Sequence, residues 1–139
     1  MKRKQAMLTL VRDVNLDLQD YRALHALLEE QFQAALGYRT ARLCAAIECI
    51  TALVDTLQAR RAQRVLLVKL LLGEGASMRD AFALLNDTAR TRLENEWQAL
   101  EALVRQCKWL NERNCKLLMD QNHIMQRVLH GEEQIYAPA

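Results

Sequence analysis

Histidine and cysteine are the side chains in this sequence best suited to metal binding or nucleophilic chemistry, but their spacing favours neither. The chain has 3 histidines and 4 cysteines. His123 and His130 lie about 10 Å apart along a helix, which is too far for both to bind one metal ion. No pair of cysteines has the C-x-x-C spacing of a zinc or redox site. We therefore expect the cysteines to be buried or half-buried apolar residues: Cys44, Cys49, Cys107 and Cys115.

The sequence also lacks the motifs that assemble a catalytic centre. It contains no H-E-x-x-H metal motif, no glycine-rich phosphate loop and no G-x-S-x-G nucleophile turn. The adjacent carboxylates Glu29–Glu30 and Glu132–Glu133 point apart on a helix, which is typical of a solvated charged surface. These observations predict a protein that is not an enzyme and that needs no cofactor or metal.

Charge and hydropathy exclude two further classes of function. The 19 basic and 17 acidic residues are mixed along the chain, unlike the dense basic surface that binds nucleic acid. The most apolar run, Val65 to Leu72, contains Lys69 and is far shorter than the roughly 20 residues of a membrane span. No apolar signal-peptide stretch follows the basic residues 2–4. We expect a soluble, cytosolic protein that neither binds nucleic acid nor inserts into a membrane.

Residues that break helices are rare, so the elements that position these side chains should be long helices. The chain has 4 glycines and 1 proline. Apolar residues at alternating steps of three and four predict helices over residues 5–36, 40–72 and 88–130. Ser77 and Asp80 form a capping-box pattern that predicts a short helix over residues 78–85. The predicted fold is all-α, an antiparallel coiled-coil-like bundle of three long helices plus one short helix.

The joints between these helices follow from single residues. Gly37 should end the first helix in the left-handed conformation, Asp87 or Thr88 should cap the last helix, and Gly131 should end it. This divides the chain into a bundle of residues 1–130 and a flexible tail of residues 131–139. The apolar run from Val65 to Leu72 should be enclosed on several sides. Three arginines before it are expected to form a solvated face: Arg60, Arg61 and Arg64.

The segment over residues 88–130 carries the most distinctive pattern. Its apolar residues suggest a seam against other helices: Leu93, Trp97, Leu100, Val104, Cys107, Leu118, Met125 and Val128. Asn111, Asn114 and Gln121 interrupt this seam, and two interpretations are open. The amides fix the register of a bundle, as a buried Asn does in coiled coils, or they line a surface for another chain. Periodicity does not separate the two.

Two segments carry a resemblance to a known family. The sequence WLNERNCKLL at residues 109–118 resembles the Asn-x-x-Asn-Gly-x-Leu-Leu/Ile core of the FlgN family of flagellar export chaperones. The sequence QIYAP at residues 134–138 is similar to the Leu-Tyr-Gly-Pro/Ala ending of that family. This chain departs from the family pattern at two positions, because Cys115 and Ala137 stand where the family has glycine.

The resemblance implies a cytosolic chaperone of flagellar type III export. Such a chaperone binds C-terminal helical segments of hook–filament junction proteins, prevents their premature assembly and delivers them to the export gate and export ATPase complex. An apolar stripe between helices suits an amphipathic cargo helix. Tyr136 matches the family tyrosine expected to contact the export gate, the alternative being an aromatic residue that folds back on the bundle. Carried over residue by residue, the cargo-binding residues are Trp109, Leu110, Asn111, Asn114, Leu117, Leu118, Asn122 and Met125.

Two other functions fit part of the pattern. A structural coiled-coil protein that forms a homo-oligomer through its long helix would explain the seam and the asparagines without any cargo. It would not explain why the amides and the C-terminal sequence coincide with the chaperone pattern. A helical nucleic-acid regulator would need a basic face, which the mixed charges do not supply.

Overall fold

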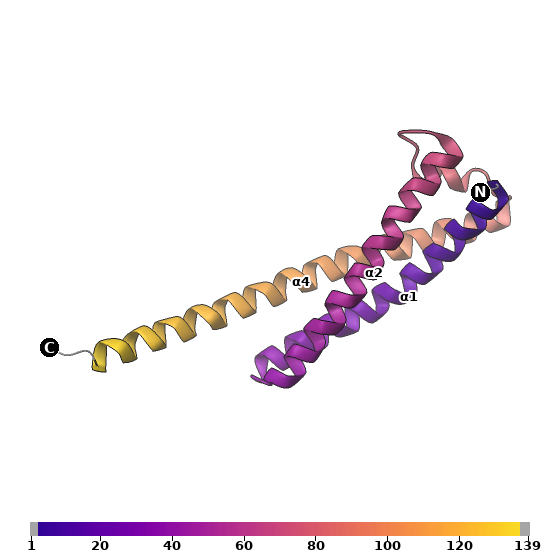
Figure 1. Ribbon diagram of the computed structural model, residues 1–139. Coiled ribbons are helices and arrows are strands. Elements are labelled where there is room, and N and C mark those ends of the chain that lie inside the picture. Colours follow the sequence, from indigo (N-terminus) through magenta and orange to yellow (C-terminus); the bar gives the residue numbers. More distant parts are fainter. Residues whose placement is uncertain (1–2, 137–139) are drawn as a thin grey trace.

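A computed structural model describes the backbone of residues 3–136 and the side chains of residues 3–130. The chain folds into three long helices and one short helix, with no strand in the described residues (Figure 1). This confirms the all-α fold predicted from the spacing of apolar residues. The helices are α1 (Arg3–Leu36), α2 (Thr40–Leu72), α3 (Met78–Phe82) and α4 (Asp87–Tyr136).

Helix α1 lies at the centre of the bundle. It packs along both α2 and α4, which have few contacts with each other. Helix α4 runs parallel to α1, because the same offset of 86 residues joins its side chains to backbone carbonyls of α1 in three successive heptads. The paired residues are Tyr21 with Cys107, Leu28 with Asn114, and Ala35 with Gln121. This repeat defines one register between the two helices.

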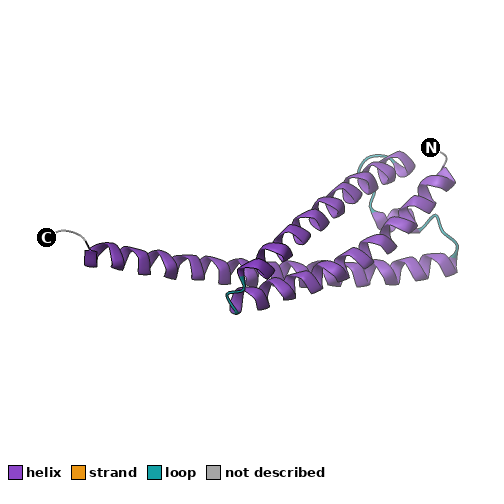
Figure 2. Cartoon of the chain, turned by 60° about the horizontal axis from the view of Figure 1, so that its bottom comes forward, coloured by secondary structure: helices purple, strands orange, loops and turns teal. Residues whose placement is uncertain are grey.

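Helix α4 extends well beyond the helices that it packs against. It has 50 residues, whereas α1 has 34. With an offset of 86 residues, the last residue of α1, Leu36, lies level with Asn122. The remaining turns of α4 therefore project from the bundle as a single helix (Figures 1 and 2). We call residues 122–136 of α4 the overhang.

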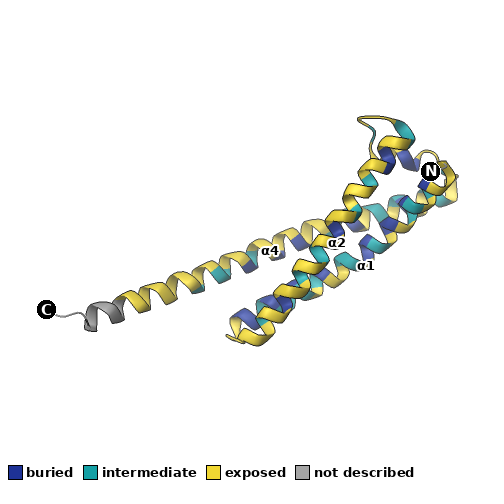
Figure 3. Ribbon diagram, viewed as in Figure 1, coloured by how far each residue is buried: buried dark blue, intermediate teal, exposed yellow. Residues whose placement is uncertain are grey.

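The buried side chains form three apolar clusters along the bundle, and α1 contributes to each of them (Figure 3). Leu10 packs with Leu67 of α2 near the start of α1. Farther along, α1 meets Phe82 of α3 and Leu93 of α4. Leu28 belongs to the third cluster, which includes residues of α2 and α4. Burial against two partners along its whole length explains the central place of α1.

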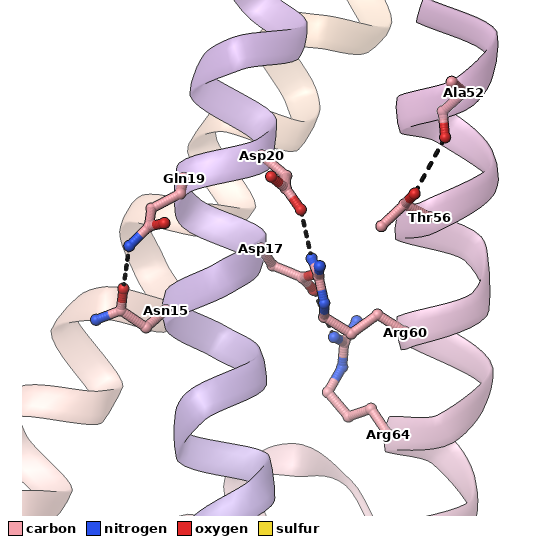
Figure 4. Close-up of polar contacts among 8 residues, drawn as sticks. All are labelled: Asn15, Asp17, Gln19, Asp20, Ala52, Thr56, Arg60 and Arg64. Carbon is pink, nitrogen blue, oxygen red and sulfur yellow. Dashed lines mark hydrogen bonds and ion pairs between the residues drawn. The ribbon is translucent and has the colours of Figure 1, made fainter.

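Ion pairs between α1 and α2 lie between the apolar clusters (Figure 4). The carboxylate of Asp17, only 2 % exposed, accepts hydrogen bonds from Arg60 at 2.7 Å and Arg64 at 2.5 Å. Arg60 also pairs with Asp20 at 2.8 Å. The guanidinium of Arg64 lies 5.5 Å from the ring centroid of Trp97 and so links α2 to α4. The predicted solvated face is therefore wrong for Arg60 and Arg64, whose charges are paired inside the bundle.

A second carboxylate beside this cluster is poorly compensated. Asp13 is buried, and its Oδ2 atom has no hydrogen-bond partner among the described residues. Burial raises the pKa of Asp13, and the negative charge of Asp17 adds to the rise. The positive charges of Arg12, Arg60 and Arg64 oppose this shift without cancelling it. Burial therefore makes the charged form of this side chain less favourable in the folded protein than in the unfolded chain.

Asp13→Asn is expected to raise the free energy of unfolding by about 1 kcal/mol at pH 7, because it removes a buried charge with an unsatisfied oxygen. The folded pKa of Asp13 lies above the unfolded value, so stability falls as the pH rises through the folded pKa. The advantage of the variant should therefore shrink as the pH falls through the folded pKa of Asp13. Urea unfolding at several pH values measures this difference. A variant that is less stable at pH 7 would contradict the prediction.

The capping box at α3 is confirmed, although this helix is shorter than predicted. Asp80 N donates to Ser77 Oγ at 3.2 Å, and Ser77 N donates to Asp80 Oδ2 at 2.8 Å. The predicted end at Leu85 is wrong, because α3 ends at Phe82. After it, Leu85 N donates to Phe82 O. This hydrogen bond joins residues three apart, as in a turn, rather than four apart as in an α-helix.

Both predicted ends of α4 also need correction. Asn86 caps the helix, since its Oδ1 accepts from Ala89 N at 2.9 Å, rather than Asp87 or Thr88. Gly131 does not end the helix, which continues to Tyr136. A glycine inside a helix costs only up to about 1 kcal/mol relative to alanine, and good helix formers follow it here. The division into a bundle of residues 1–130 and a tail of residues 131–139 stays a prediction.

The apolar run at the end of α2 is covered on one side only. Leu67 and Val68 are buried against α1 and α3, as part of the first cluster. Val65, Leu66 and Leu70 are exposed. The prediction that this run is enclosed on several sides is wrong, because α1 and α3 cover one side of it and no other described helix covers the opposite side.

The turn after α1 places a tyrosine, not a glycine, in the left-handed conformation. Tyr38 has a φ of 52°, whereas Gly37 does not have a positive φ. Tyr38 N donates to Ala35 O at 3.2 Å and Arg39 N donates to Ala34 O at 2.9 Å. This pair of hydrogen bonds is the Schellman motif, which usually has glycine at the position of Tyr38.

Tyr38→Gly is expected to raise the free energy of unfolding by about 1 kcal/mol, because glycine adopts this conformation without steric cost. Little packing is lost, since Tyr38 is 76 % exposed. Urea unfolding of both proteins measures the change. Arg39→Gly is the control and should not stabilise, because Arg39 has a φ of −91°. Equal effects of both substitutions would contradict the argument.

Candidate functional site

The overhang of α4 carries a row of large apolar side chains that nothing in the described part of the chain covers. Ile124 is 58 % exposed, Met125 56 % and Val128 52 %. Leu129 is also exposed. Ile124 and Val128 repeat, at multiples of seven residues, the positions of Leu110 and Cys107 on the face that α4 turns toward α1, and Met125 and Leu129 lie beside that face. We call these four residues the overhang stripe. Figure 3 shows that burial along α4 fades where the helix leaves α1.

The overhang stripe continues the seam of the core without the partner that the core has. In the bundle the same face of α4 buries Leu93, Leu100, Cys107 and Leu110. A helix in water gains little from an apolar stripe unless another element covers it. Contiguous exposed apolar side chains of this kind mark sites where another protein binds.

Two of the residues predicted to bind cargo lie in the core. Leu110 packs in the cluster around Leu28. Asn114 is only 1 % exposed; its Nδ2 donates to Leu28 O at 2.7 Å and to Gln31 Oε1 at 2.8 Å. Gln121 makes the matching contact with Ala35 O at 2.8 Å. These contacts fit the register interpretation of the amides, because each satisfies a backbone carbonyl at one offset.

The other six predicted residues remain accessible to different degrees. Leu117 and Leu118 are half-buried near the end of α1. Asn111, Asn122 and Met125 are exposed, and Trp109 lies on another side of the helix. The structure therefore spreads the predicted residues around α4. Those on one accessible side are Asn111, Leu118, Asn122 and Met125.

Trp109 is exposed but partly held by its neighbours. The guanidinium of Arg113 lies 3.6 Å from the ring centroid of Phe32 and 5.7 Å from that of Trp109. Arg113 also pairs with Glu29 at 3.2 Å. This cluster ties α4 to α1 on the side away from Asn111, so Trp109 contributes to packing in the free protein.

The cysteines divide into one buried and three exposed residues. Cys107 is buried, and burial raises its pKa to about 11. Cys44, Cys49 and Cys115 are exposed, so the prediction of buried or half-buried cysteines is wrong for these three. Among the described side chains, no group of three or more His, Cys, Asp or Glu is placed to hold a metal ion.

Sequence reasoning named Met125 but missed the other three members of the overhang stripe as site residues. The signal was present in the sequence. Val128 belongs to the predicted seam, and beside that seam runs a second row that repeats every seven residues: Leu103, Leu110, Leu117 and Ile124. Only the register between α1 and α4 reveals where this seam loses its partner.

Within residues 3–136, none of the helices has both the length and the apolar character that crossing a membrane requires.

The fold and the site define an all-helical binding protein, in which one long helix presents an uncovered apolar face. The family model described as FlgN protein matches residues 7–131. The chain therefore belongs to the FlgN family, and it is a flagellar export chaperone for hook-associated proteins. This confirms the predicted function and the prediction that the protein is not an enzyme. Comparison with curated proteins gave no match, and neither did comparison with solved structures.

Proposed function

We propose that the overhang stripe holds a C-terminal helical segment of a hook–filament junction protein in the cytoplasm. The observation that supports this is the row of four apolar residues that no other described residue covers, on the part of α4 that extends past α1. An amphipathic cargo helix can bury its own apolar face on such a row, as in other helix-in-groove complexes. Covering that face would also prevent the cargo from assembling prematurely.

The accessible residues of the family motif adjoin the overhang stripe. Leu118, Asn122, Met125 and Leu129 follow one another at steps of four, three and four, so they lie along one side of α4. Asn111 lies two turns earlier on the same side. Its exposed amide can hydrogen-bond a polar group at the edge of the cargo helix. Leu110 and Asn114 act indirectly in this proposal, by fixing α4 against α1.

Tyr136 is proposed to contact the export gate, with delivery to the export ATPase complex as part of the same step. It is the last residue of α4, and its side chain lies outside the described part of the structure. The helix carries its backbone to the free end of the overhang (Figure 1). This position favours contact with another protein over packing against the bundle.

Size-exclusion chromatography with the C-terminal region of a hook–filament junction protein from the same organism tests cargo binding. We expect a one-to-one complex with the wild-type chaperone. No complex would contradict the proposal, and a stable homodimer that excludes the cargo would favour the structural coiled-coil alternative. Deletion of residues 131–139 should retain cargo binding and impair export. Unchanged export would remove the gate contact from the proposal.

A further inference from the structure

A groove runs between α2 and α4, with α1 as its floor. It encloses about 250 Å³ where these three helices meet. Leu24 and Leu28 of α1 contribute to the floor. Ile50 of α2 and Val104 and Asn111 of α4 line the walls. Because α2 and α4 have few contacts with each other, the groove is open along the side away from α1.

The wall formed by α2 carries an apolar row that is only partly covered. Leu43, Ile47, Ile50 and Val54 follow one another at steps of four, three and four. This spacing places them on one side of α2, as in a seam between helices. Ile50 and Val54 pack partly against the core, whereas Ile47 is 40 % exposed. Helix α1 therefore covers one flank of this row and leaves the other flank to the groove.

The wall formed by α4 leads directly to the overhang stripe. Four of its residues are spaced seven apart: Val104, Asn111, Leu118 and Met125. Residues at this spacing lie on nearly the same side of a helix, with a shift of only about 20° per repeat. The first two line the groove, and the last belongs to the overhang stripe. The groove and the overhang stripe are thus two parts of one strip along α4. From Val104 to Leu129 this strip is about 40 Å long.

The edges of the groove are positively charged. Lys108 of α4 lines it directly. Arg61 of α2 follows Val54 by seven residues, and its charge acts on the groove residue Tyr21. Among the described residues, neither Lys108 nor Arg61 forms a salt bridge. An apolar floor between unpaired cations suits an amphipathic helix with carboxylates beside its apolar stripe.

We propose that the groove between α2 and α4 receives the same cargo helix that covers the overhang stripe. This inference rests on the proposed function, since it takes the cargo as the occupant. The bound helix, about 25 residues long, completes a four-helix arrangement over the bundle and runs out along α4. Residues of α1 and α2 then contribute to binding, although the family motif lies in α4. The helix is apolar on one face and acidic along its flanks.

Two variants of the full chain test the groove by calorimetric titration with the same junction-protein fragment. Ile47→Asp places a charge on the apolar wall and should weaken binding about tenfold. Lys108→Glu reverses an exposed charge and should also weaken binding, by a factor that falls as salt is added. Circular dichroism of each variant should match the wild type.

Cys49→Asp is the matched control, because Cys49 is exposed and lies about 200° around α2 from Ile47. It adds the same charge to the same helix and should leave the affinity unchanged. Met125→Asp, in the overhang stripe, separates this inference from the proposed function. If Met125→Asp weakens binding and neither groove variant does, the groove inference is wrong and the overhang proposal stands. If the wild type forms a dimer that Ile47→Asp converts to a monomer, a second copy occupies the groove and the inference is overturned.

Discussion

Asp17→Ala is expected to lower the free energy of unfolding by about 3–5 kcal/mol, because it leaves two largely covered arginines without their shared buried partner. Asp17 bonds to Arg60 with one carboxylate oxygen and to Arg64 with the other. The side chains of these arginines are 13 % and 11 % exposed, so water cannot readily replace the lost carboxylate. Asp20 would remain beside Arg60 only. The two guanidiniums would then repel each other inside the bundle.

Urea unfolding followed by circular dichroism measures this loss. Asp20→Ala is the matched control, since it removes a carboxylate from the same arginine at a more exposed position. Its effect should be within about 1 kcal/mol, as for other solvent-screened pairs. Similar losses for Asp17→Ala and Asp20→Ala would contradict the argument from burial. The free energy of unfolding of Asp17→Asn should lie between those of the wild type and Asp17→Ala, because the amide oxygen can still accept a hydrogen bond from one arginine.

This ion cluster was not predictable from the sequence. Asp17 lies one residue from Leu18 on the apolar stripe of α1, and periodicity alone treats such a residue as an edge position. The arginines of α2 are 43 and 47 residues away in sequence. Only the antiparallel packing of α1 and α2 brings the charges together. The local sequence pattern therefore predicted a solvated face for Arg60 and Arg64, whereas their contacts with α1 place both side chains inside the bundle.

The long helices were predictable because their signal is local and repeated. Steps of three and four over many turns define α1 and α2 to within a few residues of the observed ends. The two ends of α4 were predicted wrongly, for a different reason at each end. Gly131 is a weak breaker in a helix whose flanking residues favour helix, and Asn86 outcompetes the next two residues as the cap.

The candidate site was predictable as a helix but not as a surface. Asn111 and Asn114 are three residues apart and indistinguishable by spacing, yet one is exposed and the other is 1 % exposed. The difference comes from the direction in which α1 lies. Likewise, the overhang exists because α1 ends level with Asn122, which depends on the register between two distant segments.

Met125→Asp combined with Val128→Asp is expected to weaken cargo binding at least about 100-fold, if the overhang stripe is the binding surface. Both side chains are more than half exposed in the free protein. Removing them costs the bundle little, so the free energy of unfolding should change by less than about 0.5 kcal/mol per substitution. In the complex, each aspartate would be buried against the apolar face of the cargo helix. An unpaired buried charge is far less favourable than the apolar contact that it replaces.

The matched control moves each aspartate two residues toward the N-terminus, to His123 and Gln126. Residues two apart differ by about 200° around a helix, so both new charges leave the stripe. His123→Asp with Gln126→Asp thus adds the same two carboxylates to the same turns of α4 and should leave the affinity near that of the wild type. Titration calorimetry and circular dichroism of both double variants separate a lost surface from a lost helix. Equal weakening by both would mean that charge on the overhang, rather than its apolar face, governs binding. If neither double variant weakens cargo binding, the overhang stripe is not the binding surface and the cargo binds elsewhere on the bundle.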